Sequence, residues 1–273
     1  MSEKRILTIQ DISCVGQCSL TVALPILSAF GLETAILPSA VLSTHTGGFT
    51  GYTFRDLTED IPAIAAHWKK ENLKFDAFYT GYVGSKKQLE YISDIIKTLG
   101  TDDAVTIIDP VMGDNGKLYA GFDEAFAEEM ARFCSLADVI IPNFTEAAYL
   151  LKEPFVQIGE YDEAYVEGLL KRLAGLGAKN VVLTGVSFDK SKLGVAIYDG
   201  KDIYYDFNDY LPVAMHGTGD VFASAFTGAM ASGKTIQEAA ALAADFVVDS
   251  IKATESTHKY GVRFEKALHS VNK

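Results

Sequence analysis

Residues 216–220 have the sequence His-Gly-Thr-Gly-Asp and lead directly into an apolar pattern of helical spacing over residues 221–230. The two glycines allow the backbone to approach a bound ligand closely. The first turn of a helix offers free N–H groups and a partial positive charge, which favour a bound anion. Asp220 would lie in that turn, where a carboxylate can accept a proton from a hydroxyl that attacks phosphorus. The stretch predicts a phosphate-handling site, although Thr218 and Asp220 also suit plain helix capping.

A second glycine-rich pattern lies just downstream, where residues 228–235, GAMASGKT, match the phosphate-loop pattern GxxxxGKT. That motif binds phosphate only between a strand and a helix. Here a helical pattern precedes the motif and another follows it, so the context is wrong. We predict instead a turn between two helices, with Gly233 ending the first and Thr235 capping the second.

The rest of the chain alternates short β-rich runs with longer helical patterns. Strands are predicted at residues 5–10, 33–37, 76–80, 104–108, 138–141, 180–183, 194–198 and 203–207, and helices at 19–30, 58–70, 86–99, 123–133, 160–173, 218–253 and 262–271. Repeated strand–helix units predict an α/β fold with a mainly parallel central sheet and helices on both faces. Since no Pro-, Gly- or Ser-rich linker divides the sequence, we expect one domain over residues 1–273.

The composition excludes several classes of protein. Apolar residues make up 48% and charged residues 22% of the chain, as in ordinary globular proteins. A net charge of −12 repels a nucleic-acid backbone. There is no apolar run of the roughly 18 residues that a membrane span needs, and Met1–Gln10 has no signal-peptide pattern. Cys14, Cys18 and Cys134 are too few for a disulfide framework and lack partners at zinc spacing, which fits a reducing cytoplasm.

Polar clusters follow several predicted strands, at the edge of the sheet where α/β proteins bind ligands. They are DPVMGD at 109–114, PNFTE at 142–146 and Thr184-Gly185. Carboxylates and an amide at such positions suit water-mediated Mg²⁺ binding beside nucleotide phosphates. Each cluster also has a structural explanation, because Asp109 and Asp114 suit a turn and Asn143 with Glu146 has the spacing of a capping box.

Together these segments resemble the ribokinase superfamily of kinases, and within it the pyridoxal kinases. Gly217–Asp220 is similar to the superfamily signature, and the pyridoxal kinases are matched by DPVMGD, by Asn143 with Glu146, by GYVGS at 81–85 and by STHTG at 43–47. The resemblance implies a three-layer ribokinase-like fold, ATP and Mg²⁺ as cofactors, a cytoplasmic homodimer, and no nucleic-acid or membrane partner. It leaves dependence on a monovalent cation open.

The resemblance also implies a role for individual residues. Asp220 would be the catalytic base that activates the 5′-hydroxymethyl group of a vitamin B6 vitamer (pyridoxal, pyridoxine or pyridoxamine), and the amides of Gly217, Thr218 and Gly219 would form the anion hole. The remaining site residues would be Asp109, Asp114, Asn143, Glu146 and Thr184 around ATP, with Mg²⁺ held through water by Glu146 and Asp114, and His45, Thr46 and Tyr82 around the pyridine ring.

One departure from the family bears on the substrate. Pyridoxal kinases usually carry a serine after the first strand's Ile-Gln, whereas here Asp11 follows Ile9-Gln10, and residues 12–19 depart from the usual glycine- and asparagine-bearing loop. A carboxylate at position 11 could accept from a protonated ring nitrogen, bind the amine of pyridoxamine, or favour another heterocycle. The alternatives are therefore a hydroxymethylpyrimidine kinase of the same superfamily and a non-catalytic binder of pyridoxal phosphate.

Overall fold

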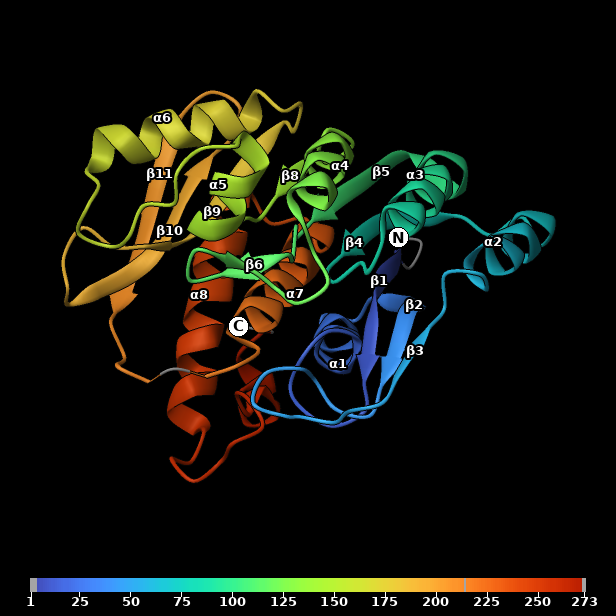
Figure 1. Cartoon of the computed structure of the whole chain (residues 1–273), viewed down its shortest axis with the longest axis horizontal. Helices are drawn as coiled ribbons and strands as arrows, with labels where there is room; N and C mark the ends of the chain where they lie inside the picture. Colours follow the sequence, from blue (N-terminus) through green and yellow to red (C-terminus); the bar gives the residue numbers. More distant parts are fainter. Residues whose placement is uncertain (1–3, 214, 272–273) are drawn as a thin grey trace.

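The computed structural model describes residues 4–213 and 215–271, and within these ranges nine strands form one central sheet (Figure 1). The strand order is β11-β10-β9-β8-β5-β4-β1-β2-β3. The bounds are β1 (Arg5–Ser13), β2 (Glu33–Leu42), β3 (Phe54–Asp56), β4 (Phe75–Thr80), β5 (Gly100–Ile108), β8 (Val139–Ile140), β9 (Asn180–Val186), β10 (Lys192–Tyr198) and β11 (Ile203–Asp209). All strand pairs are parallel from β2 across β1, β4, β5 and β8 to β9. Strand β3 pairs antiparallel with β2 at one edge, and β10 and β11 pair antiparallel at the other. The predicted mainly parallel sheet is confirmed.

Helices cover both faces of this sheet, which gives the three layers of the predicted architecture (Figure 1). Their bounds are α1 (Leu20–Ala29), α2 (Ile61–Lys70), α3 (Lys86–Leu99), α4 (Glu124–Cys134), α5 (Phe144–Leu151), α6 (Glu163–Ala174), α7 (Thr218–Ala231) and α8 (Ile236–Ala253). Side chains alternate between the faces of a strand, so Ile6 and Ile107 pack with α1, α7 and α8, while Leu7 and Ile108 pack with α2 to α6. In the ranges that the structure describes, no helix is long and apolar enough to cross a membrane.

Polar side chains begin most of the helices. Ser85, Asp123 and Asp162 cap α3, α4 and α6 by accepting a hydrogen bond from a backbone N–H of the first turn. Thr235 and Glu238 form a capping box at α8, and Gly233 follows the end of α7 with φ 95°. The phosphate-loop pattern therefore lies in a turn between two helices, as its sequence context predicts.

The structure departs from the sequence predictions in some short segments. The helix predicted over residues 262–271 is wrong: two 3₁₀ segments, Phe264–Lys266 and Leu268–Ser270, occupy this stretch. Their apolar residues recur at helical spacing, but the hydrogen bonds close three residues apart. Helix α5, strand β3 and the hairpin of β6 (Gly113–Asp114) and β7 (Lys117–Leu118) are too short to give a periodic signal. Strand β1 continues to Ser13, so Asp11 lies within the strand rather than after it.

Candidate active site

The predicted site residues lie around the carboxyl ends of the parallel strands. Asp11 belongs to the last part of β1, Tyr82 follows β4, and Asp109 follows β5 directly. Asn143 begins α5 just beyond β8, and Thr184 lies within β9. Since these strands are neighbours in the sheet, residues far apart in the sequence share one edge, as expected for a ligand site in an α/β fold.

Helix α7 begins at this edge without a side-chain cap. Its N-cap is Gly217, which has φ 83°, and the N–H of Val221 closes the first turn on the Gly217 carbonyl at 2.9 Å. A Cβ on Gly217 would overlap the carbonyl oxygen of Gln17, so the close approach and the positive φ both require glycine here. Gly219 is exposed and has open space where a Cβ would stand. The backbone N–H groups of this turn are therefore accessible to an anion.

The carboxylate of Asp220 lies in the first turn of α7 in an unusual electrostatic environment. Burial and then the nearby Asp11 carboxylate raise the pKa of Asp220 to about 7. The nearby backbone N–H of Ser19 and thiol of Cys18 partly oppose this rise in pKa. A carboxyl group with a pKa near neutrality is well suited to take up and release a proton at physiological pH.

Asp109 and Glu146 form a second pair of perturbed carboxylates. Both are buried, with 7% and 3% of their surfaces exposed. Burial raises the pKa of Glu146 to about 8, although the backbone N–H groups of Asn143 and Met112 donate to its oxygens at 2.9 and 3.3 Å. The pKa of Asp109 is raised well above its usual value by burial and by the carboxylates of Glu146 and Asp220. A bound cation would favour the ionised forms of these two carboxyl groups, which burial and their mutual repulsion otherwise disfavour.

The other polar residues of the predicted nucleotide side are held by local hydrogen bonds. The side-chain amide of Asn143 donates to the carbonyl of Gly113 at 2.9 Å, and the hydroxyl of Thr184 donates to the carbonyl of Pro142 at 3.4 Å. Asp114 is exposed, and its two oxygens accept from the backbone and side-chain N–H groups of Asn115 at 2.8 Å each. Asp114 is still close enough to raise the pKa of Glu146. The structure therefore brings these residues together.

The donor set fits Mg²⁺ bound through water rather than by the protein alone. Within residues 4–213 and 215–271, no three His, Cys, Asp or Glu side chains gather closely enough to hold a metal ion. Asp109 and Glu146 nevertheless repel each other in a buried place, which a divalent cation with its water shell would relieve. Mg²⁺ commonly uses one or two carboxylates together with waters and phosphate oxygens.

The predicted substrate-binding residues lie at the other end of the site. Nδ1 of His45 accepts from the N–H of Gly47 at 3.1 Å, and the His45 ring lies 5.4 Å from His216 and 5.0 Å from Phe49. Burial and His216 lower the pKa of His45, so the ring stays neutral and Nε2 carries the proton. That N–H is buried without a partner among the described residues. Thr46 is exposed in the same loop.

Tyr82 and Asp11 connect this substrate end to the base. The ring of Tyr82 is half-buried and 5.5 Å from Phe122. Burial and then the Asp11 carboxylate raise the pKa of Tyr82 to about 12. Asp11 is buried, accepts from the hydroxyl of Ser13 at 2.8 Å and has its own pKa raised by burial. Asp11 thus lies close to both Tyr82 and Asp220.

Sequence reasoning missed two residues, Cys18 and Ser19, that influence the pKa of the base. Cys18 was considered only as part of a metal pair, and Ser19 was given no role beyond the start of a helix pattern. Both belong to the loop of residues 12–19, whose departure from the family pattern was the available signal. Their influence on Asp220 depends on the packing of α1 against α7, which sequence periodicity does not predict.

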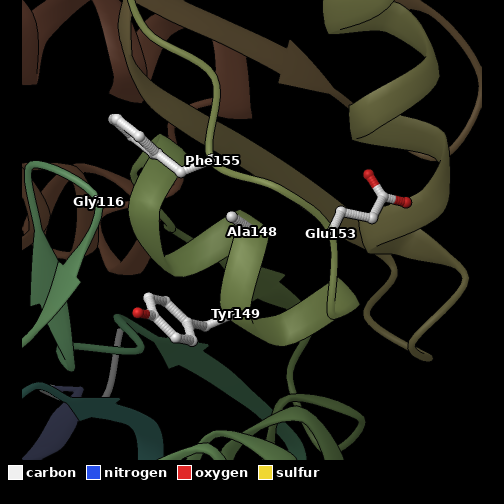
Figure 2. Close-up of a pocket in the computed structure, with 5 residues that line it drawn as sticks. All are labelled: Gly116, Ala148, Tyr149, Glu153 and Phe155. Carbon is white, nitrogen blue, oxygen red and sulfur yellow. The ribbon is translucent and has the colours of Figure 1, made fainter.

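A cavity of about 180 Å³ lies outside this site, along the later part of α5 (Figure 2). It is lined by Gly116, Ala148, Tyr149, Glu153 and Phe155, none of which is a predicted site residue. Glu153 pairs with Arg172 at 2.8 Å. The cavity lacks the several convergent polar groups of a catalytic centre, so the strand ends remain the candidate site.

The three-layer fold and the Gly-Thr-Gly-Asp start of α7 define a ribokinase-like kinase. The structure of pyridoxal kinase from Lactobacillus plantarum superposes with a TM-score of 0.91 at 33% identity, over 99% of this chain and 97% of that chain. The family model described as phosphomethylpyrimidine kinase matches residues 35–264, and the chain belongs to this family.

Two further relatives are similar to the chain over most of its length. A Bacteroides thetaiotaomicron protein described as a phosphomethylpyrimidine kinase, crystallised with pyridoxal, is 38% identical with a TM-score of 0.93, over 100% of this chain and 96% of that chain. The pyridoxine/pyridoxal/pyridoxamine kinase of Bordetella pertussis is 27% identical over 264 residues, which cover 91% of this chain and 89% of the relative.

Proposed function

We propose that this protein transfers the γ-phosphoryl group of ATP to the 5′-hydroxymethyl group of a vitamin B6 vitamer. The products are ADP and the vitamer 5′-phosphate. The observation that carries the proposal is the position of Asp220, whose carboxylate has a pKa near neutrality and lies beside the uncapped start of α7. A base directly next to an anion site is what phosphoryl transfer to a hydroxyl requires.

Asp220 would take up the proton that the substrate hydroxyl loses during phosphoryl transfer. Its ionised carboxylate accepts the proton of the hydroxymethyl group as that oxygen forms a bond to the γ-phosphorus. The bond between the γ-phosphorus and the bridging oxygen of ATP breaks, and ADP leaves. The proton is later released to solvent, which is readily done at neutral pH because the pKa of Asp220 is about 7.

The backbone amides of Gly217, Thr218 and Gly219 are assigned to the transferring phosphoryl group. They lie at the positive end of α7, and Gly219 leaves them open on the solvent side. Such fixed donors stabilise charge that develops in the transition state without reorganising. The protein's contribution is mainly positioning and electrostatics.

The acidic end of the site is assigned to Mg·ATP. Glu146 and Asp114 would hold Mg²⁺ through water, and Asp109, Asn143 and Thr184 would line the nucleotide cleft. When bound, Mg²⁺ neutralises phosphate charge that the carboxylates of this acidic site would otherwise repel. Glu146 would hold the hydrated Mg²⁺ in one orientation, because backbone N–H groups fix its side chain.

His45, Thr46, Tyr82 and Asp11 are assigned to the pyridine ring. The face of Tyr82 suits an aromatic ligand, and the unpaired Nε2–H of His45 is a donor for a ring substituent. Asp11 adds a carboxylate that can accept from a protonated ring nitrogen or from the amine of pyridoxamine. The substrate named by the Bacteroides crystal structure supports a pyridine ring at this position.

Hydroxymethylpyrimidine is the alternative substrate, because the matching family model carries the phosphomethylpyrimidine kinase description and Asp11 departs from the usual pyridoxal kinase serine. The mechanism assigned to Asp220 and to α7 is the same for both substrates. We further propose, from the family resemblance and the sparse cysteines, that the protein acts as a cytoplasmic homodimer.

The test is ADP release with Mg·ATP against the three B6 vitamers, hydroxymethylpyrimidine and ribose, with Asp220→Asn beside the wild type. We expect turnover on a B6 vitamer and a loss of about 10²- to 10⁴-fold in kcat for the variant. Turnover on hydroxymethylpyrimidine alone would move the substrate assignment to the alternative. Tight vitamer binding without any turnover would contradict the kinase assignment.

A further inference from the structure

The hairpin of β6 and β7 lies outside the nine-stranded sheet and forms a two-stranded sheet of its own. Each strand has two residues, and Asp114 pairs with Lys117 on either side of the turn. The turn residues Asn115 and Gly116 both have positive φ, 51° and 76°, as in the tight turns typical of hairpins. A hairpin alone is only marginally stable in water, so contacts with the rest of the protein must hold this one in place.

Two residues at the start of α5 hold the hairpin by hydrogen bonds. The side-chain amide of Asn143 donates to the carbonyl of Gly113 at 2.9 Å. The backbone N–H of Gly116 donates to the hydroxyl oxygen of Thr145 at 2.8 Å. Thr145 is 2% exposed, and its methyl carbon would lie 3.1 Å from a Cβ on Gly113. The methyl and the hydroxyl of Thr145 therefore contact the hairpin at two places, in β6 and in the turn.

The ring of Phe155, just beyond the end of α5, lies against the same turn (Figure 2). A Cβ on Gly116 would lie 2.8 Å from Cδ1 of Phe155, so the ring approaches the turn backbone closely. Both residues also line the cavity of about 180 Å³ along the later part of α5. Asn143, Thr145 and Phe155 together form the seat of the hairpin.

The seat determines where the carboxylate of Asp114 lies. Asp114 is exposed, and its two oxygens accept from the backbone and side-chain N–H groups of Asn115 at 2.8 Å each. The carboxylate is thus tied to the turn, and a displaced turn would carry it along. Because the proposed function assigns Asp114 to Mg²⁺ through water, such a displacement would weaken the metal site.

The part of the substrate end that follows the hairpin is anchored separately. The ring of Phe122 stacks on Phe126 of α4 at 4.2 Å between centroids and packs against Tyr82 at 5.5 Å. Asp123 caps α4 directly after Phe122. None of these contacts uses the seat. A loosened hairpin should therefore affect the metal and nucleotide side of the site and leave the vitamer side unchanged.

We propose that Thr145, supported by Phe155, is a positioning residue that fixes the β6–β7 hairpin on α5 and thereby sets the affinity for Mg²⁺ with its nucleotide through Asp114. The proposal rests on the proposed function, because it takes Asp114 as a residue that holds Mg²⁺ through water. Its structural basis is the hydrogen bond from Gly116 to Thr145, since so short a hairpin cannot hold its position alone.

Trypsin cleavage after Lys117 measures how firmly the hairpin is seated. Lys117 is exposed but lies in β7, so cleavage requires the hairpin to open. Thr145→Val keeps the shape and one methyl but removes the acceptor, and it should speed cleavage about fivefold, the factor that one hydrogen bond typically supplies. Thr145→Ser keeps the acceptor and should be cleaved like the wild type, whereas Phe155→Ala should be cleaved faster.

Cleavage after Lys201 is the internal control. This exposed lysine lies in the turn between β10 and β11, far along the sheet from the hairpin seat. Its cleavage rate should be the same in the wild type and in every variant. A variant that is merely less stable overall would be cleaved faster at both lysines.

Calorimetric titration with Mg·ADP tests the link to the metal. The Kd of Thr145→Val for Mg·ADP should rise about fivefold, because its hairpin is open for a larger part of the time. With ADP in the absence of Mg²⁺, Thr145→Val and the wild type should bind alike, and KM for the vitamer should also be unchanged. Thr145→Ser should restore the Kd for Mg·ADP. A purely structural role of Thr145 would not give this dependence on Mg²⁺.

The outcomes separate this proposal from the proposed function. If the wild type binds Mg·ADP but phosphorylates none of the compounds tested, the proposed function fails, and the Kd values of the Thr145 variants still decide the role of the seat. The positioning role is overturned if Thr145→Val leaves cleavage after Lys117 unchanged, if Thr145→Ser behaves like Thr145→Val, or if the hairpin opens without any change in the Kd for Mg·ADP.

Discussion

Asn143 and Glu146 hold each other in place at the start of α5. The backbone N–H of Asn143 donates to Oε2 of Glu146 at 2.9 Å, and the N–H of Glu146 donates to Oδ1 of Asn143 at 2.9 Å. The other oxygen of the Glu146 carboxylate, Oε1, accepts a second N–H, that of Met112. The capping box and the metal-site role that the sequence suggested are therefore compatible, because the cap fixes a carboxylate that faces Asp109.

Replacement of Glu146 by glutamine should weaken the use of Mg²⁺. The variant keeps the shape of the side chain but loses the charge that would attract a hydrated cation. We expect the half-saturating Mg²⁺ concentration to rise by about tenfold or more, as for other residues that orient metal-bound water. Mg²⁺ titrations of initial rate at saturating ATP and vitamer measure this. Glu153→Gln, in the cavity outside the site, is the control and should leave the Mg²⁺ dependence unchanged.

The stability of the ligand-free protein should fall as pH rises toward 8. The pKa of Asp220 is about 7 when folded, above its ordinary value of 3.8, so the folded state keeps a proton that the unfolded chain releases. This contribution is fully present below about pH 4 and is lost as pH rises through about 7. Glu146, with a pKa of about 8, acts in the same direction.

Urea unfolding of the wild type and Asp220→Asn between about pH 5 and pH 8 checks this sign. The asparagine cannot ionise, so its advantage in free energy of unfolding over the wild type should grow with pH. Parallel curves for the two proteins would mean that the pKa of Asp220 is not raised.

Gly217 and Gly233 offer a matched pair for testing the start of α7. Both have positive φ, 83° and 95°, but a Cβ would overlap the Gln17 carbonyl only at Gly217, since Gly233 has open space. Gly233→Ala should cost about 1 kcal/mol of stability and leave kcat unchanged. Gly217→Ala should cost more stability and lower kcat about tenfold or more, because the anion-binding amides move. Equal effects of the two substitutions on kcat would remove the anion-hole assignment.

The sequence predicts the parts of this molecule that depend on local pattern and leaves out those that depend on packing. The helix predicted over residues 86–99 has the observed bounds of α3, because its apolar spacing is a local signal. Asp109, Asn143 and Thr184 could be grouped because parallel strands end at one edge. The influence of Cys18 on the pKa of Asp220, by contrast, depends on residues about 200 positions apart that the packing of α1 on α7 brings near each other.

The unusual backbone conformation of Ser19 can be tested apart from its side chain. Ser19→Gly and Ser19→Ala both remove the hydroxyl group, and both keep the backbone N–H. Only glycine adopts φ 56° with ψ −135° without steric cost, so Ser19→Gly should be more stable than Ser19→Ala by about 1–2 kcal/mol. Urea unfolding midpoints, with m-values compared between the variants, measure the difference. Equal stabilities would show that the backbone at Ser19 relaxes in solution.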